Sequence, residues 1–104
     1  MNASTVAEIV TFRLKPETSE QDFHAAADAM TPFLRSTGAM VSRTLSTDND
    51  GQWTDHILWQ TQEAATEASN AMFNRPEAAP FMEMIETADL IMKYAPVALY
   101  LPPE

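Results

Sequence analysis

Residues 5–14 read TVAEIVTFRL, and this stretch decides the fold. Its apolar side chains occupy both parities, with Val10 and Phe12 on one side of an extended chain and Ile9 on the other. Such a run is typical of a strand that is buried on both faces. Glu8 is the exception, because it interrupts the more apolar parity. The stretch therefore predicts a buried strand that carries one carboxyl group in apolar surroundings.

A helix is expected after this strand. Pro16 ends the strand, and Thr18 followed three residues later by Gln21 forms a capping-box pattern. Pro32 lies inside the apolar stripe of the helix, where it lacks an N–H and its ring clashes with the preceding turn. We therefore expect the helix to kink or shorten near Met30.

The rest of the chain divides into a hairpin, two helices and a last strand. The expected bounds are 40–47 and 53–61 for the hairpin strands, 62–73 and 76–89 for the helices, and 94–101 for the last strand. Thr61 can cap the first of these helices, and Pro96 places the last strand at a sheet edge, because proline donates no ladder hydrogen bond. The order is βαββαβ, which predicts a ferredoxin-like α+β fold with a four-stranded antiparallel sheet and helices on one face.

Length and composition limit the possible functions. The chain has 104 residues, which indicates a single domain over 1–104. Six Lys and Arg against fifteen Asp and Glu give a net charge of −9, which disfavours nucleic acid and anionic membrane surfaces as partners. There is no cysteine, so disulfides and thiolate nucleophiles are excluded, and two histidines make a metal site improbable. We expect a cytoplasmic protein without a membrane span.

A second copy of the chain is the expected partner. Helices of one chain cover only one face of such a sheet, yet Ile9 and Leu58 place apolar side chains on the other. Burial of that face against a second sheet would close a barrel between protomers, with an interior for a small molecule. The alternative is a monomer with a shallow apolar groove.

Three segments resemble the stress-responsive A/B-barrel branch of the dimeric α/β-barrel superfamily. They are VAEIVTFRLK at 6–15, DHIL at 55–58 and NRPEAAPF at 74–81. The segment WQTQEA at 59–64 is similar to the W-x-S-x-E-A junction of the antibiotic-biosynthesis monooxygenases, another branch. These resemblances imply a homodimer and cofactor-independent monooxygenase or cyclase chemistry on a small apolar or aromatic substrate.

The chain departs from both branches at functional positions. The stress-responsive A/B-barrel branch, which includes a cyclase, carries histidines where this chain has Glu8 and Ala78. The haem-degrading monooxygenases use a helix histidine as an iron ligand, and no histidine occurs between Gln62 and Tyr94. The resemblance therefore does not extend to haem, and no cofactor is expected.

Glu8 and His56 are the candidate catalytic residues. A carboxyl group in apolar surroundings has a raised pKa and suits general acid or base catalysis. His56 lies on the strand expected to run antiparallel beside the first, so the imidazole and the carboxyl group can share a face and move protons together. The structural alternatives are a Glu8 that hydrogen-bonds Arg13, Arg43 or water, and a His56 satisfied by the backbone or Asp55.

Phe12, Trp59 and Tyr94 are the candidate substrate-binding residues. Trp59 has opposite parity to His56, which favours a core position or a pocket wall. Whether the protein is an enzyme stays open at this stage. The rival function is a non-catalytic ligand-binding protein or a structural dimerisation domain, which the missing family histidines support.

Overall fold

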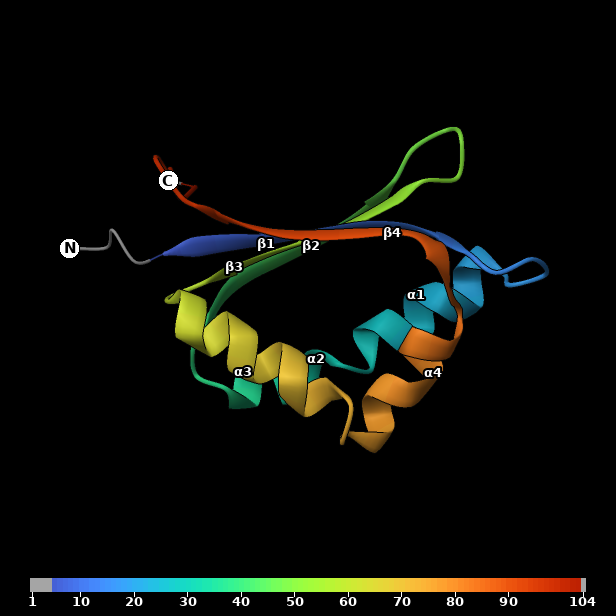
Figure 1. Ribbon diagram of the computed structural model, residues 1–104, viewed down its shortest axis with the longest axis horizontal. Coiled ribbons are helices and arrows are strands. Elements are labelled where there is room, and N and C mark those ends of the chain that lie inside the picture. The colour runs from blue at the N-terminus through green and yellow to red at the C-terminus, as the bar shows by residue number, and fades with distance from the viewer. Residues whose placement is uncertain (1–4, 104) are drawn as a thin grey trace.

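The computed structural model describes residues 5–103. The elements follow in the order β1 (Val6–Leu14), α1 (Glu20–Asp28), α2 (Thr31–Ser36), β2 (Met40–Thr47), β3 (Trp53–Trp59), α3 (Gln62–Met72), the 3-10 helix η2 (Pro76–Ala78), α4 (Ala79–Glu83) and β4 (Ile85–Pro96). In Figure 1 the strands form one layer and the helices lie together on one face of it. The predicted βαββαβ fold is confirmed. No helix of the described residues is long and apolar enough to cross a membrane.

The four strands pair in the order β2-β3-β1-β4, and each neighbouring pair is antiparallel. β1 therefore lies in the interior of the sheet, which explains its apolar residues on both faces. Pro96 is the last residue of β4, an edge strand, as predicted. In the pairing of β1 with β3, Glu8 lies opposite Ile57 and Ile9 lies opposite His56.

The first helix starts one residue later than the capping-box pattern predicted. A turn at Pro16 and Glu17, where Glu17 has a φ of 70°, precedes the helix. Ser19 is the N-cap, and its side chain accepts a hydrogen bond from the backbone N–H of Asp22. The predicted break is confirmed: α1 ends at Asp28 and α2 is a separate helix with Pro32 in its first turn.

The hairpin and the helix that follows it agree with the sequence prediction. The Asp48 carboxylate accepts hydrogen bonds of 2.9 Å from the backbone N–H groups of Asp50 and Gln52, which stabilises the turn between β2 and β3. Thr61 caps α3 by accepting a hydrogen bond from the backbone N–H of Ala64. α3 then lies against the face of the sheet that the helices cover, which is called the inner face below (Figure 1).

The last helix and strand differ from the prediction. The helix expected over 76–89 ends at Glu83, and the strand expected over 94–101 already begins at Ile85. The reason is pairing with β1: Leu14 lies opposite Ile85 and Thr11 lies opposite Ile91, with a register shift between them. Backbone pairing along almost the whole of β1 overrides the helical spacing of apolar residues in this segment.

The core lies between the sheet and the helices. Phe23 of α1 makes edge contacts with Phe12 and Trp53, at centroid distances of 5.7 and 5.0 Å, and stacks on Phe81 of α4 at 5.1 Å. Such aromatic pairs contribute about 0.5–1.5 kcal/mol each beyond area burial. This cluster fixes α1 and α4 to the sheet at one end of the layer.

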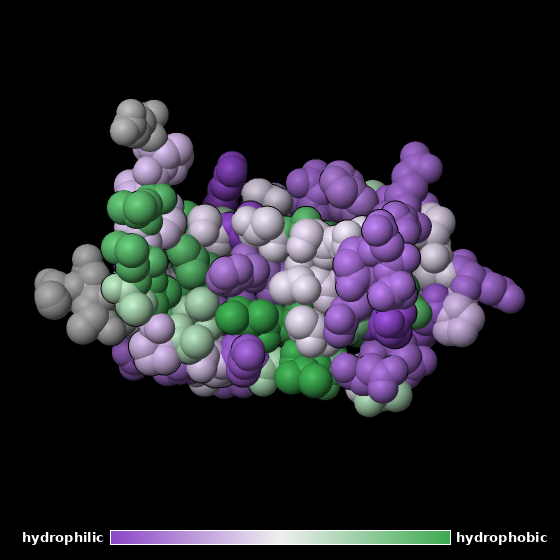
Figure 2. Space-filling view, turned by 90° about the horizontal axis from the view of Figure 1, so that it is seen from above, coloured by the Kyte–Doolittle hydropathy of each residue, from purple (hydrophilic) through white to green (hydrophobic). Residues whose placement is uncertain are grey.

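The outer face of the sheet is less apolar than the sequence suggested. Register places Ile9, Leu58 and Ile91 on this face, but threonine, serine, histidine and lysine residues lie between them. Figure 2 looks onto this face and shows pale and purple residues interrupted by green patches. The helices of the chain do not cover it.

Candidate ligand-binding cavity

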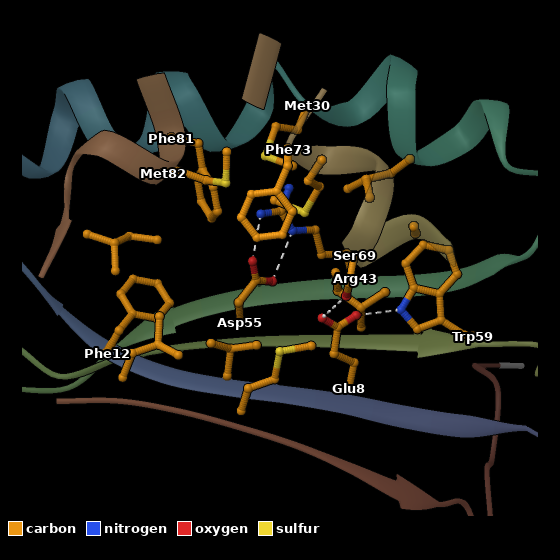
Figure 3. A pocket seen from close by; sticks show the side chains of 18 residues that line it. Glu8, Phe12, Met30, Arg43, Asp55, Trp59, Ser69, Phe73, Phe81 and Met82 are labelled. Atoms are coloured by element: carbon orange, nitrogen blue, oxygen red, sulfur yellow. Dashed lines mark hydrogen bonds and ion pairs between the residues drawn. The ribbon is translucent and has the colours of Figure 1, made fainter. Parts of the chain in front are cut away.

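A cavity of about 270 Å³ lies between the inner face of the sheet and the helices. Side chains from all four strands and from α2, α3 and α4 line it, and most of them are apolar (Figure 3). The cavity is thus inside one chain. The predicted interior between two protomers would lie on the other face of the sheet, so this cavity is not the one that the sequence suggested.

Glu8 is one of two buried acids in the cavity wall, with only 7% of its surface exposed. Its Oε1 accepts a hydrogen bond of 2.8 Å from Nε1 of Trp59 on β3. Its Oε2 accepts a longer one of 3.4 Å from the Ser69 hydroxyl on α3. Ser69 Oγ also lies 3.2 Å from the Tyr94 hydroxyl on β4. Two elements, β3 and α3, therefore supply the partners of the Glu8 carboxyl group, and Tyr94 of β4 extends the network through Ser69.

Burial raises the pKa of Glu8 above its ordinary value, because the charged form loses hydration. The hydrogen bond from Trp59 opposes this change, and the negative charge of Asp55 adds to it. A carboxyl group with a raised pKa can donate a hydrogen bond in its neutral form and accept a proton in its charged form. The site is thus suited to proton transfer with a molecule in the cavity.

Arg43 and Asp55 form the second polar group of the cavity wall. Nε and Nη2 of Arg43 donate to the two carboxylate oxygens of Asp55 at 3.0 and 2.7 Å. Nη1 donates to the backbone carbonyl of Ala27 at 2.9 Å, and the guanidinium lies over the Phe81 ring at 5.5 Å. The charges of Arg43 and Asp55 therefore compensate each other. Arg43 does not hydrogen-bond Glu8, so the structural alternative in which Arg43 is the partner of Glu8 is wrong.

The structure does not bring Glu8 and His56 together. Glu8 lies opposite Ile57, so its face of β3 carries Asp55, Ile57 and Trp59, whereas His56 pairs opposite Ile9. His56 is exposed on the outer face. The predicted shared face of Glu8 and His56 is therefore wrong, because side chains alternate along a strand and the register differs by one residue from the one that the prediction required.

The candidate substrate-binding residues lie on the cavity side of the sheet. Phe12 and Trp59 line the cavity and are each 1% exposed. Tyr94 lies opposite Glu8 across the pairing of β1 with β4, and it reaches the polar centre through Ser69. Tyr94 is thus a partner of the site, not part of the cavity wall.

Sequence reasoning missed Ser69, and the role of Asp55 as the partner of Arg43. Ser69 lies next to Ala68 and four residues after Ala65, both buried on the inner face of α3, so helical periodicity could have identified it. Asp55 has the same strand parity as Ile57 and Trp59, which marks it as a second acid in apolar surroundings. Among residues 5–103 no group of three or more potential ligands is placed to hold a metal ion.

No protein-family model and no curated protein matches the sequence. Solved structures do match. SnoaB, a cofactor-independent oxygenase from Streptomyces nogalater, has a TM-score of 0.77 at 16% identity, with 97% of this chain and all of that chain covered. A Bordetella bronchiseptica protein assigned to the antibiotic-biosynthesis monooxygenases has a TM-score of 0.75 at 15% identity, over 92% and 99% of the chains.

A third structure, the hydroxynitrile lyase from Passiflora edulis, has a TM-score of 0.63 at 14% identity, over 96% of this chain and 99% of that one. An oxygenase and a lyase thus share one architecture. Sequence identities this low show that the fold is shared and do not assign an activity. The chain has the ferredoxin-like βαββαβ fold of these solved structures, as the sequence predicted.

Proposed function

We propose that the protein binds a small, largely apolar or aromatic molecule in the cavity and that Glu8 transfers a proton to or from it without a cofactor. The observation that carries the proposal is the buried Glu8 carboxyl group, which has no cation as a hydrogen-bond partner, in the wall of a mostly apolar cavity. Burial of a carboxylate that has only neutral hydrogen-bond donors is costly, and carboxyl groups with a raised pKa are common at functional sites.

The cavity limits the ligand to a small molecule with few polar groups. Its volume of about 270 Å³ is close to the lower end of typical ligand pockets, about 300 Å³. A carbonyl or phenolic oxygen would contact Glu8, and the rings would lie against Phe12 and Trp59. Such a molecule gains mostly from apolar burial and is oriented by one hydrogen bond.

In the proposed reaction the Glu8 carboxylate removes a proton from a carbon next to a carbonyl group or from a phenol. Trp59 keeps its hydrogen bond to Oε1 and so fixes the carboxyl plane. Ser69 and Tyr94 form a hydrogen-bonded chain from Oε2 to β4, along which the proton can leave. The anion formed would then react with dioxygen in an oxygenase or close a ring in a cyclase, and the first step is common to both.

The test is proton exchange at an activated carbon. 2-Tetralone is a small bicyclic ketone with acidic hydrogens, and their exchange in D2O is followed by NMR. We expect the protein to accelerate exchange above the buffer rate, and Glu8→Gln to abolish this acceleration. His56→Ala, on the opposite face, and Glu63→Gln, on the exposed first turn of α3, are controls that should retain it. Exchange that is unchanged in Glu8→Gln contradicts the proposal.

Ligand binding without chemistry is the second candidate function. It is favoured by the hydrogen bonds of Glu8, since both carboxyl oxygens already accept one. The probe is 1,4-naphthoquinone, which quenches tryptophan fluorescence, and a chain without cysteine offers it no thiol to alkylate. Trp53→Phe leaves Trp59 as the only tryptophan and keeps a ring against Phe23. Quenching of Trp59 without exchange of 2-tetralone would favour this second function.

We also propose a homodimer that buries the outer face of the sheet. The support is the uncovered face with Ile9, Leu58 and Ile91, together with the shared fold. Analytical ultracentrifugation at micromolar concentration should find a dimer, and Ile91→Glu should dissociate it because an uncompensated charge at the interface is costly. A monomer at all concentrations contradicts the dimer but not the cavity, which one chain forms alone.

A further inference from the structure

The opening of the cavity can be located from the exposure of its lining residues. Only two of them, Phe73 and Met92, are exposed, at 78% and 40%. Phe73 follows the last residue of α3, and Met92 lies on the edge strand β4. The cavity therefore meets the surface between the C-terminal end of α3 and β4.

We propose that Phe73 is the gate of this opening and controls which ligands reach Glu8 and how fast. The inference rests on the proposed function. Figure 3 shows the Phe73 ring turned toward the cavity, although most of the residue is in contact with solvent. A ring in that position narrows the path to the carboxyl group without being fixed by the core.

The backbone around Phe73 is held, so the side chain is the part that can move. The N–H groups of Asn74 and Arg75 donate to the carbonyls of Ala71 and Met72, at 2.9 and 3.2 Å. The next turn is fixed in addition, because Arg75 forms a salt bridge of 2.8 Å with Glu77 and lies over the Phe33 ring. Rotation of an exposed ring about its side-chain bonds takes picoseconds to nanoseconds and needs no movement of the helix.

The other residues near the opening are adaptable. Met72, Met82 and Met92 lie on α3, α4 and β4, respectively, and all three line the cavity. Methionine side chains are flexible and make favourable contacts with aromatic rings. A flat ring can therefore pass between the thioethers, whereas the gate residue selects against bulky, non-planar molecules.

The experiment measures association and dissociation of 1,4-naphthoquinone by stopped-flow quenching of Trp59, in the Trp53→Phe chain. A gate changes both rate constants and leaves their ratio nearly constant. If the open state is populated to about 10% or less, Phe73→Ala should raise both rate constants about tenfold or more and change Kd by less than about threefold.

Leu99→Ala is the matched control. Leu99 is 77% exposed, close to the value for Phe73, but does not line the cavity, so its removal should leave both rate constants unchanged. The gate is refuted if Phe73→Ala leaves the association rate constant unchanged, if only Kd rises, or if Leu99→Ala has the same effect. Met92→Ala, at the other side of the opening, should also speed association.

The outcomes separate the gate from the proposed function. If naphthoquinone fails to quench Trp59 in the chain that retains Phe73, the cavity is not a ligand site and both proposals fail. If it binds with a pH dependence that Glu8→Gln removes, and Phe73→Ala leaves the rate constants unchanged, only the gate fails.

Discussion

Replacement of Arg43 by methionine tests the polar part of the cavity wall. The guanidinium donates three hydrogen bonds that join β2, β3 and the end of α1, two of them to Asp55 and one to the carbonyl of Ala27. The side chains of Arg43 and Asp55 are 13% and 8% exposed. Methionine keeps an unbranched apolar side chain at this position but leaves the Asp55 carboxylate buried without its cation.

Removal of one partner of a buried ion pair costs about 3–5 kcal/mol, because the remaining charge is left uncompensated. The geometry supports the upper part of this range, since the pair is bidentate and a carbonyl oxygen also loses its donor. The free energy of unfolding of Arg43→Met should therefore fall by about 3–5 kcal/mol. The double variant Arg43→Met with Asp55→Leu should recover much of this loss, because no buried charge remains.

Urea unfolding followed by circular dichroism, with all four members of the double-mutant cycle, measures these values. The matched control is Arg75→Met, which removes the more exposed salt bridge to Glu77. It should cost about 1 kcal/mol or less. A loss below about 1 kcal/mol in Arg43→Met as well would refute the argument, because the pair would then behave like a solvated one.

Three further predictions concern Glu8 and the first helix. The pKa of Glu8 is raised in the folded state, so this group stabilises the fold fully below its ordinary pKa, and the contribution is lost as the pH rises through the raised value. Urea unfolding measured against pH should show this loss of stability. In Glu8→Gln the pH dependence should be absent. Trp59→Phe removes a donor that lowers the pKa of Glu8, so the pKa should rise further, and the pH at which urea unfolding shows the loss of stability should move upward. Ser19→Ala removes the N-cap of α1 and should lower the free energy of unfolding by about 0.5–2 kcal/mol, which thermal unfolding will show; an unchanged Tm would mean that water replaces the cap.

Naphthoquinone offers carbonyl oxygens only, so its binding should depend on the protonation of Glu8. The neutral carboxyl group donates a hydrogen bond to a carbonyl, and the carboxylate cannot. Affinity should therefore fall as the pH rises through the raised pKa of Glu8. Glu8→Gln keeps an N–H donor and should bind with little pH dependence. Affinity that rises with pH would show that the ligand does not accept a hydrogen bond from Glu8.

Local sequence patterns predicted the fold well where interactions between neighbouring residues determine the conformation. Thr61 as a cap, Pro32 as a helix break and the turn at 48–51 act through neighbouring residues, and the structure confirms each. The prediction for residues 85–91 was wrong because a long-range interaction determines their conformation. Residues 85–91 become a strand because β1 provides a partner for them, and that partner is more than 70 positions away in the sequence.

The candidate site was predicted in part. The position of Glu8 in the most apolar strand identified it as a buried acid, and parity alone separated Trp59 from His56. Parity within each strand could not fix the register between strands, and a shift of one residue decides whether Glu8 meets His56 or Ile57. The cavity inside one chain was not predicted, because it depends on how the helices pack on the sheet, and the expected interior between two protomers stays a prediction.

The two buried acids of the inner sheet face differ in how they are compensated. Asp55 has a bidentate cation from the neighbouring strand, a pairing that holds elements together. Glu8 has only neutral donors, an indole and a hydroxyl, and these do not prevent burial from raising its pKa. A group needed only for packing would be more stable as an apolar side chain. An acid kept in this state, beside an open volume, is better explained by proton transfer or by a hydrogen bond to a ligand.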